Sequence, residues 1–218
     1  MKGAPNFEIR LADENDAERL AFIGAETFRS TFGHLYAPAD IAAFLAESHS
    51  PEAYRRTLTT PDFRVWIAEA DGGATVGYAV AGPCGLPVPD LTPNSGEVKR
   101  IYLDETARGT GLGARLMASA LEYLRKRFDR IYLSVYSENF PAQRFYERFG
   151  FAKIGEYDFM VGEHADPEWM MELGEPETAQ IARPCGWNPA WNAARKARIL
   201  SPQAAETRTP CPTSARSK

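Results

Sequence analysis

The sequence predicts an α/β (α+β) protein built on a mixed sheet, and three observations lead to that class. Segments that alternate apolar and polar side chains are interleaved with segments whose apolar residues recur at helical spacing. Their order is irregular, so a repeating βαβ array is not expected. A glycine-rich turn also joins one central strand to a helix.

The first part of the chain predicts one strand and three helices. Residues 7–11 alternate apolar and polar side chains, as a half-buried strand does. A helix is expected over 13–31, because its apolar residues form one stripe and Asp13 can cap its start. Two shorter helices, 38–46 and 51–58, each begin with proline, which the first helical turn tolerates.

A hairpin and a central strand follow. The runs 63–69 and 75–80 flank the turn sequence Asp-Gly-Gly at 71–73, which predicts a hairpin. Four prolines make residues 83–95 a loop. The apolar run 98–103 is the next strand, and it leads directly into the glycine-rich turn.

The rest of the sheet is expected between residues 112 and 173. Apolar residues at helical spacing predict a helix over 112–128 and then a strand over 130–135. A helix over 141–149 ends at a glycine, a common helix stop. Two closing strands, 151–159 and 169–173, complete the sheet.

Charge and composition divide the 218 residues into two regions. Residues 1–174 carry 18 Lys and Arg against 26 Asp and Glu, a net charge of −8, whereas residues 175–218 carry seven against three, a net +4. Six prolines also fall in this second region. We therefore expect a folded domain over 1–174 and a basic, proline-rich, mobile extension over 175–218, with room for a short helix over 189–200.

The same numbers exclude several classes of protein. A total net charge of −4 argues against a broadly basic nucleic-acid binder. No run of about 18 apolar residues predicts a membrane helix, and the first residues have no apolar signal segment. Three cysteines, Cys84, Cys185 and Cys211, give neither a disulfide framework nor a metal-binding spacing. We expect a cytoplasmic protein without a metal and with free thiols.

The turn Arg108-Gly109-Thr110-Gly111-Leu112-Gly113 has a physical use. Glycines let a ligand approach the backbone, and the free N–H groups of a helix start attract a phosphate. The turn also fits the dinucleotide fingerprint G-x-G-x-x-G/A, but it lies in mid-chain behind a hairpin and lacks the later acidic partner. A turn without any ligand is the other alternative.

Two motifs together resemble the GNAT superfamily of acetyl-CoA-dependent N-acetyltransferases. Arg108, Gly111 and Gly113 fit its R-x-x-G-x-G pyrophosphate loop. The second motif, N-x-x-A-x-x-F-Y-x-x-x-G-F, is matched by Asn139, Ala142, Phe145, Tyr146, Gly150 and Phe151. The resemblance covers residues 7–174. It implies the GNAT fold, a central mixed, mostly antiparallel sheet with a splayed pair of parallel strands and helices on both faces.

A narrower resemblance lies nearer the N-terminus. The segment Glu26-Thr27-Phe28-Arg29-Ser30-Thr31-Phe32, followed by a helix from Pro38, looks like the spermidine/spermine acetyltransferases of the bacterial PaiA type. Residues 159–162 share this likeness. In that family the first helices shape the acceptor site, which makes Glu26, His34 and Tyr36 candidates for binding the substrate. His164 and Asp166 either line the same pocket or form a turn between the closing strands.

The resemblance also assigns residues to acetyl-CoA. Backbone N–H groups of Arg108, Gly109, Thr110, Gly111, Leu112 and Gly113 would hold the pyrophosphate, with the Arg108 side chain either helping or only solvated. The backbone of Ile101, Tyr102 and Leu103 would pair with the pantetheine arm and polarise the thioester carbonyl. Asn139 would contact the pantetheine amides, or would only cap its helix.

Two residues are expected to move protons. Tyr146 is the family's usual general acid, and a phenol with a pKa near ~10 can protonate a departing thiolate of a thiol near ~8.5. Glu97, eleven residues before Arg108, has the spacing of the glutamate base in histone-acetylating members. The alternatives are an aromatic core residue for Tyr146, and for Glu97 a strand-end carboxylate paired with Lys99 or Arg100.

The resemblance therefore implies direct acetyl transfer to a primary amine. An acidic domain favours a cationic small-molecule acceptor, and a polyamine is the first candidate. A protein or peptide N-acetyltransferase and a non-catalytic acyl-CoA sensor remain alternatives. Family members often form dimers, so a homodimer is open, whereas a membrane or nucleic-acid partner is not expected.

Overall fold

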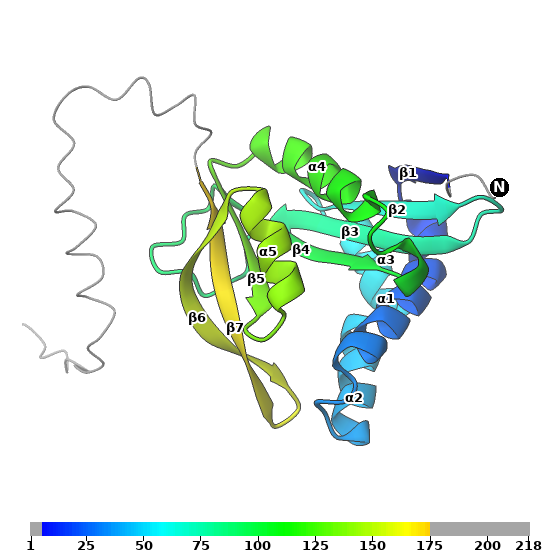
Figure 1. Cartoon of the computed structure of the whole chain (residues 1–218), viewed down its shortest axis with the longest axis horizontal. Helices are drawn as coiled ribbons and strands as arrows, with labels where there is room; N and C mark the ends of the chain where they lie inside the picture. Colours follow the sequence, from blue (N-terminus) through cyan, green and yellow to red (C-terminus); the bar gives the residue numbers. More distant parts are fainter. Residues whose placement is uncertain (1–5, 175–218) are drawn as a thin grey trace, which may run out of the picture. The chain divides into compact units, whose positions relative to one another are not determined.

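The computed structural model describes residues 6–174, and the expected extension over 175–218 with its helix 189–200 lies outside them. A single seven-stranded sheet has the order β1-β2-β3-β4-β5-β7-β6 (Figure 1). The strands are β1 (Phe7–Leu11), β2 (Arg64–Ala70), β3 (Thr75–Pro83), β4 (Ser95–Leu103), β5 (Arg130–Tyr136), β6 (Phe151–Val161) and β7 (His164–Leu173). Only β4 and β5 pair in parallel; every other pair of neighbouring strands is antiparallel.

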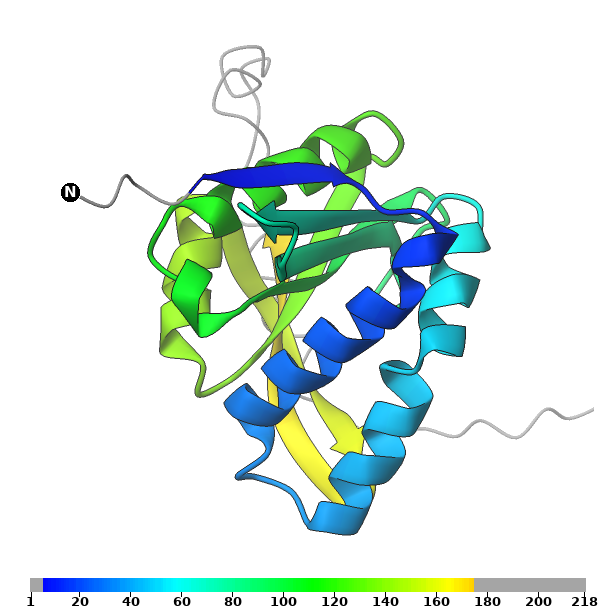
Figure 2. The same cartoon turned by 90° about the vertical axis from the view of Figure 1, so that its right-hand side faces the viewer.

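Helices cover both faces of this sheet, as the family resemblance implies. The α-helices are α1 (Ala17–Phe32), α2 (Pro38–Ser48), α3 (Pro51–Thr59), α4 (Leu112–Arg125) and α5 (Phe140–Arg148). Figure 2 shows α1 and the two helices after it on one side and α4 on the opposite side. The predicted mixed, mostly antiparallel sheet with helices on both faces is confirmed.

Alternation along β2 explains the two layers. Trp66 and Ala68 face α4 and join the larger apolar core, whereas Val65 and Ile67 face α1 and join a second core. Ile67 and Ala68 are completely buried although they are adjacent, which requires cover on both faces. The strand is therefore buried between two layers of helices.

Residues 13–32 form two helices rather than the one expected. A short 3-10 helix (Glu14–Asp16) precedes α1, and Asp13 caps it by accepting the Asn15 N–H at 2.8 Å. The Asp16 carboxylate accepts the Asp13 N–H in return, at 3.0 Å. This reciprocal cap holds the first turn in the tighter geometry before α1 begins.

The last strand begins earlier than its sequence predicts. We expected it from Trp169, but β7 starts at His164, so His164 and Asp166 belong to the strand. The first residues of β7 pair with β6 alone, because β5 pairs with β7 only from Glu168 onwards. Pro167 therefore lies just outside the ladder with β5, where its carbonyl accepts the Ser137 N–H at 2.9 Å and no N–H of its own is required.

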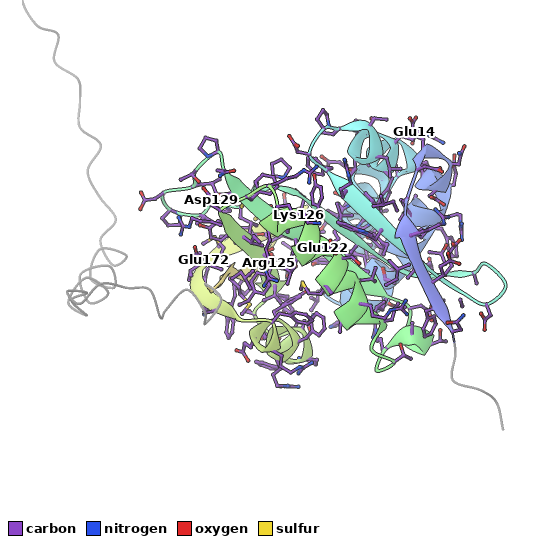
Figure 3. All side chains as sticks on the ribbon, turned by 90° about the horizontal axis from the view of Figure 1, so that it is seen from above. Glu14, Glu122, Arg125, Lys126, Asp129 and Glu172 are labelled. Atoms are coloured by element: carbon purple, nitrogen blue, oxygen red, sulfur yellow. The ribbon has the colours of Figure 1, made fainter. Side chains whose placement is uncertain are left out.

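The outer face of α4 is charged. Glu122, Arg125 and Lys126 project from it into solvent (Figure 3), and Lys126 pairs with Glu122 at 2.7 Å, one helical turn away. Such exposed pairs contribute little to stability. Across residues 6–174, we find no helix whose length and apolar content would allow it to span a bilayer.

Candidate active site

The parallel pair at the centre of the sheet separates soon after it forms. β4 and β5 are paired only from Ser95 to Glu97 on one strand and from Arg130 to Tyr132 on the other. Beyond Glu97, β4 stays bonded to β3, so its opposite edge offers free backbone groups along 98–103. A bulge at Lys99 interrupts the register with β3. An extended ligand can therefore pair with this edge as a strand would.

The glycine-rich turn lies at the end of that edge. Gly109 and Gly111 have φ angles of 75° and 85°, a left-handed conformation that side chains disfavour. A Cβ atom at either position would meet nothing within 4 Å, so these glycines serve the conformation of the turn rather than close packing. Gly111 is the N-cap residue of α4. The first N–H groups of α4 consequently point out of the helix, where an anion binds favourably.

Helix α5 closes the other side of the gap. Asn139 caps it by accepting the Ala142 N–H at 3.3 Å, so the predicted cap is confirmed. Tyr146, two turns into α5, is partly buried against the larger core. Burial and then the charge of Glu168 raise the pKa of Tyr146 to about 12. Tyr146 therefore keeps its proton at neutral pH and can donate it.

These elements enclose a cavity of about 660 Å³, which we call the glycine-loop cavity. Most of the residues predicted to bind acetyl-CoA line it: Ile101, Tyr102, Leu103, Arg108, Gly109, Gly111, Gly113, Asn139 and Tyr146. Thr110 and Leu112 do not. The Thr110 hydroxyl donates to the Ala107 carbonyl at 2.7 Å and the Leu112 side chain is buried in the core, so both stabilise the turn.

A second cavity, of about 690 Å³, lies on the α1 side of the sheet. We call it the aromatic cavity, because rings from several elements line it: Phe28, Phe32, Tyr36, Phe44, His49, Phe63, Tyr102, Tyr136, Tyr157 and Phe159. Four carboxylates, Glu47, Glu97, Asp166 and Glu168, also line it, against two cations, Lys99 and Arg100. Aromatic faces and an excess of carboxylates suit a cationic ligand.

The two cavities meet in the gap between β4 and β5. Seven residues line both of them: Phe32, Lys99, Arg100, Tyr102, Ser134, Tyr136 and Glu168. A ligand along the open edge of β4 and a ligand among the aromatic rings would therefore touch at this gap. Of the two predicted catalytic residues, Tyr146 lines only the glycine-loop cavity and Glu97 only the aromatic cavity.

Glu97 is buried and already has partners. Its Oε2 accepts the backbone N–H of Gly85 and lies 2.8 Å from Nζ of Lys99, each contact having the same length. This is the strand-end ion pair that the sequence offered as the alternative role for Glu97. The pair fixes the bulge of β4 to the loop after β3.

Glu168 is a site residue that the sequence did not single out. Its Oε2 accepts the Tyr157 hydroxyl at 2.8 Å, and the same phenol oxygen lies 3.2 Å from Oγ of Ser134. Within the described part of the chain Glu168 forms no ion pair. Burial raises its pKa, and the charges of Asp166 and Glu97 raise it further. Glu168 could have been found from its place two residues after Asp166, because both side chains then share one face of a strand. That argument requires β7 to start at His164 rather than at Trp169.

Of the three residues predicted to bind the acceptor, Glu26, His34 and Tyr36, only Tyr36 lines a cavity. Tyr36 is buried in the aromatic cavity and donates its hydroxyl to Asp166. Burial and this bond raise the pKa of Tyr36 above its usual range. Glu26 is exposed and pairs with Arg29, and His34 is exposed; neither lines a cavity. Asp166 also lies 3.1 Å from Nε2 of His164, which packs edge-on against Tyr36.

A buried polar chain supports the wall of the aromatic cavity. Nδ1 of His49 lies 3.0 Å from the Tyr54 hydroxyl, which donates to the Tyr78 hydroxyl at 2.7 Å. The Arg100 guanidinium stands over the Tyr54 ring, 5.6 Å from its centroid. Burial, with a contribution from the Arg100 charge, lowers the pKa of His49 to about 3. His49 is therefore a neutral residue in the wall of the cavity, and no sequence motif pointed to it.

Among residues 6–174, no three His, Cys, Asp or Glu side chains are placed to hold a metal ion together. Cys84 lies outside both cavities, and burial raises the pKa of its thiol.

Known proteins resemble this chain in sequence or in fold. An uncharacterised N-acetyltransferase of Mycobacterium tuberculosis is 32% identical over 157 residues, which cover 72% of this chain and 96% of the relative. The spermine/spermidine N(1)-acetyltransferase of Bacillus subtilis is 37% identical over 91 residues, 40% of this chain and 59% of that protein. The crystal structure of the PaiA N-acetyltransferase of Thermoplasma acidophilum in complex with coenzyme A has the same fold, with a TM-score of 0.61 and 22% identity over 78% of this chain and 99% of that one.

The family model of the acetyltransferase (GNAT) family matches residues 26–151, from the middle of α1 to the first residue of β6. The match includes the open edge of β4, the glycine-rich turn and α5, which are the elements that line the glycine-loop cavity. The chain is an N-acetyltransferase and belongs to the GNAT family.

Proposed function

We propose that this chain transfers the acetyl group of acetyl-CoA to a primary amine of a polyamine. The meeting of the two cavities at the gap between β4 and β5 is the observation that carries the proposal. One cavity has the features that a nucleotide thioester needs, and the other has those of an amine site. Their shared residues would bring the two substrates into contact, which removes much of the entropic barrier to reaction.

The glycine-loop cavity fits acetyl-CoA. The turn from Arg108 to Gly113 would hold the pyrophosphate on its backbone N–H groups, aided by the dipole of α4. The free edge of β4 from Ile101 to Leu103 would bond the pantetheine amides. Asn139 lines the same wall, although its amide oxygen is engaged by the cap of α5. Acetyl-CoA, when bound, supplies the acetyl group as an activated thioester.

Two groups of the chain would assist the transfer. A backbone N–H of the β4 edge would donate to the thioester oxygen, where negative charge develops. Tyr146 would give its proton to the departing sulfur, and its raised pKa keeps that proton available until the sulfur becomes basic.

The aromatic cavity supports a polyamine as the acceptor. Its four carboxylates outnumber its two cations. Asp166 and Glu168 lie two residues apart in β7, so their side chains share one face of the strand, and both line the cavity. Two carboxylates on one wall suit a ligand with more than one ammonium group. The partial likeness to the spermine/spermidine acetyltransferase of Bacillus subtilis supports the same substrate class.

Release of free coenzyme A is the decisive assay. The purified full chain would be given acetyl-CoA with spermidine, spermine, lysine peptides or aminoglycosides, each at the same concentration. We expect kcat/KM for spermidine or spermine to exceed that for every peptide by at least tenfold. A preference for peptides would instead indicate a protein N-acetyltransferase. Tight acetyl-CoA binding with no release across the panel would indicate a sensor.

A further inference from the structure

We propose that Glu168 binds the ammonium group of the acceptor and takes the proton that it must lose before the amine attacks. This inference rests on the proposed function and names the group that activates the amine. Three observations about Glu168 carry it: its place at the gap, its free charge and its hydroxyl partners.

The position of Glu168 separates it from Glu97. Glu168 lines both cavities, whereas Glu97 lines only the aromatic cavity and lies where β4 and β5 are still paired. In the sheet register Glu168 is opposite Tyr136, the last residue of β5, and therefore beyond the point where the two strands separate. The acceptor nitrogen must reach this point, because only here can it touch a thioester in the other cavity.

Within residues 6–174, no ion pair neutralises the charge of Glu168. Glu97 has Lys99 as its counter-ion, but the partners of Glu168 are the hydroxyls of Tyr157 and Ser134. A partly buried carboxylate without a counter-ion is costly, and an ammonium group would remove that cost. Burial and the charges of Asp166 and Glu97 also raise the pKa of Glu168, which makes it a stronger base than an exposed carboxylate.

The acid and the base of the reaction would then be neighbours. Glu168 and Tyr146 both line the glycine-loop cavity, and the charge of Glu168 raises the pKa of Tyr146. The acceptor nitrogen loses two protons as its ammonium becomes an amide. One passes to Glu168 and leaves to solvent; the N–C bond forms, the C–S bond breaks, and the sulfur receives a proton from Tyr146. The second proton of nitrogen restores the phenol.

The experiment compares kcat/KM for spermidine between pH 5.5 and 9 in the parent, Glu168→Gln and Glu172→Gln. Glu172 is the matched control, because it lies on the same strand, is paired with Arg130 and lines neither cavity. We expect Glu168→Gln to lose at least 100-fold in kcat and to lose the acidic limb of the profile. Glu172→Gln should have a kcat within twofold of the parent's and should retain the acidic limb. A Glu168→Gln variant with the parent's limb overturns the inference.

A second variant tests Glu168 by removing the hydroxyl of Tyr157, its hydrogen-bond partner. The Tyr157 hydroxyl donates to Glu168 and lowers its pKa, so Tyr157→Phe should move the acidic limb to higher pH. The titratable and charged groups around Glu168 come from every neighbouring element: Tyr36, Glu97, Lys99, Arg100, Tyr102, Tyr136, Tyr146, Tyr157 and Asp166. The Glu97→Gln variant should retain the acidic limb. If the limb disappears in Glu97→Gln but not in Glu168→Gln, Glu97 is the base and the inference is wrong.

Binding provides a readout without turnover. Calorimetric titration of spermidine into the chain saturated with coenzyme A should give an affinity that falls at least tenfold in Glu168→Gln and less than twofold in Glu172→Gln. Equal affinities in these two variants contradict the ammonium site. If the parent acetylates no amine at all, the proposed function fails and the inference fails with it; an active parent with a fully active Glu168→Gln variant defeats the inference alone.

Discussion

Nζ of Lys99 lies 2.8 Å from Oε2 of Glu97, and the same oxygen accepts the backbone N–H of Gly85. Lys99 is the bulged residue of β4, and it lines both cavities. One carboxylate oxygen therefore connects the bulge to the loop that follows β3. We expect these contacts of Glu97 to position Lys99 at the gap.

This pair should be energetically coupled. A double-mutant cycle of Glu97→Gln and Lys99→Met should give a coupling energy of about 1 kcal/mol in urea unfolding, because both side chains are largely buried. The pair Glu122 and Lys126 on α4 is the control, since both side chains are mostly exposed and their coupling should be smaller. Coupling in the control that equals or exceeds that of the Glu97 pair would contradict the role of Glu97.

Replacing Tyr146 by Phe should separate chemistry from binding. We expect kcat to fall about 100-fold, because the departing sulfur loses its proton donor, while the dissociation constant for acetyl-CoA stays within twofold. Tyr132→Phe is the control: its buried hydroxyl has no hydrogen-bond partner in residues 6–174 and lies outside both cavities. Steady-state kinetics and calorimetry measure the two effects. An unchanged kcat would remove Tyr146 from the mechanism.

Gly111→Ala should weaken acetyl-CoA binding by tenfold or more. The left-handed backbone at Gly111 costs an L-residue about 1–2 kcal/mol, so the turn would rearrange and its N–H groups would no longer converge. Gly73→Ala is a matched control, because Gly73 has a φ of 81°, equally open surroundings and a place in the hairpin turn after β2. Both variants should lose similar stability in thermal unfolding, but only Gly111→Ala should lose affinity.

His49 should make the chain sensitive to acid. Its pKa is about 3 in the fold because the ring is buried, against 6.5 for an ordinary histidine. Between pH 6.5 and pH 3, His49 is therefore protonated in the unfolded chain but neutral in the folded chain. The free energy of unfolding decreases as pH falls through this range. Melting temperatures between pH 7 and pH 4 should fall less steeply in His49→Gln than in the parent. The exposed His34→Gln should follow the parent, and parallel curves for all three would contradict the buried neutral ring.

Local interactions made much of the fold and of the glycine-loop cavity predictable. The two glycines with positive φ, the cap at Asn139 and the apolar stripe of α4 act within a few residues, so short patterns in the sequence reveal them. The predicted members of the glycine-loop cavity are close in the chain for the same reason.

The aromatic cavity depends on contacts between distant residues. Asp166 meets Tyr36 across 130 positions, and Glu168 reaches the gap because β7 pairs with β5 from that residue onwards. The proline in β7 concealed the start of the strand, and the isolated sequence around His49 carries no mark of its burial. Glu26 and His34 had suitable chemistry and a suitable place in the chain, but they lie on exposed positions.

The brief pairing of β4 with β5 has a mechanical consequence. In the described sheet, three residue pairs form the ladder between the four-stranded part, β1 to β4, and the part formed by β5, β7 and β6. A ligand that forms hydrogen bonds with the open edge of β4 would add bonds at the place where β4 and β5 separate. Amide hydrogens along 98–103 should then exchange more slowly with deuterium when coenzyme A is bound, and the two parts of the sheet should unfold together rather than in sequence.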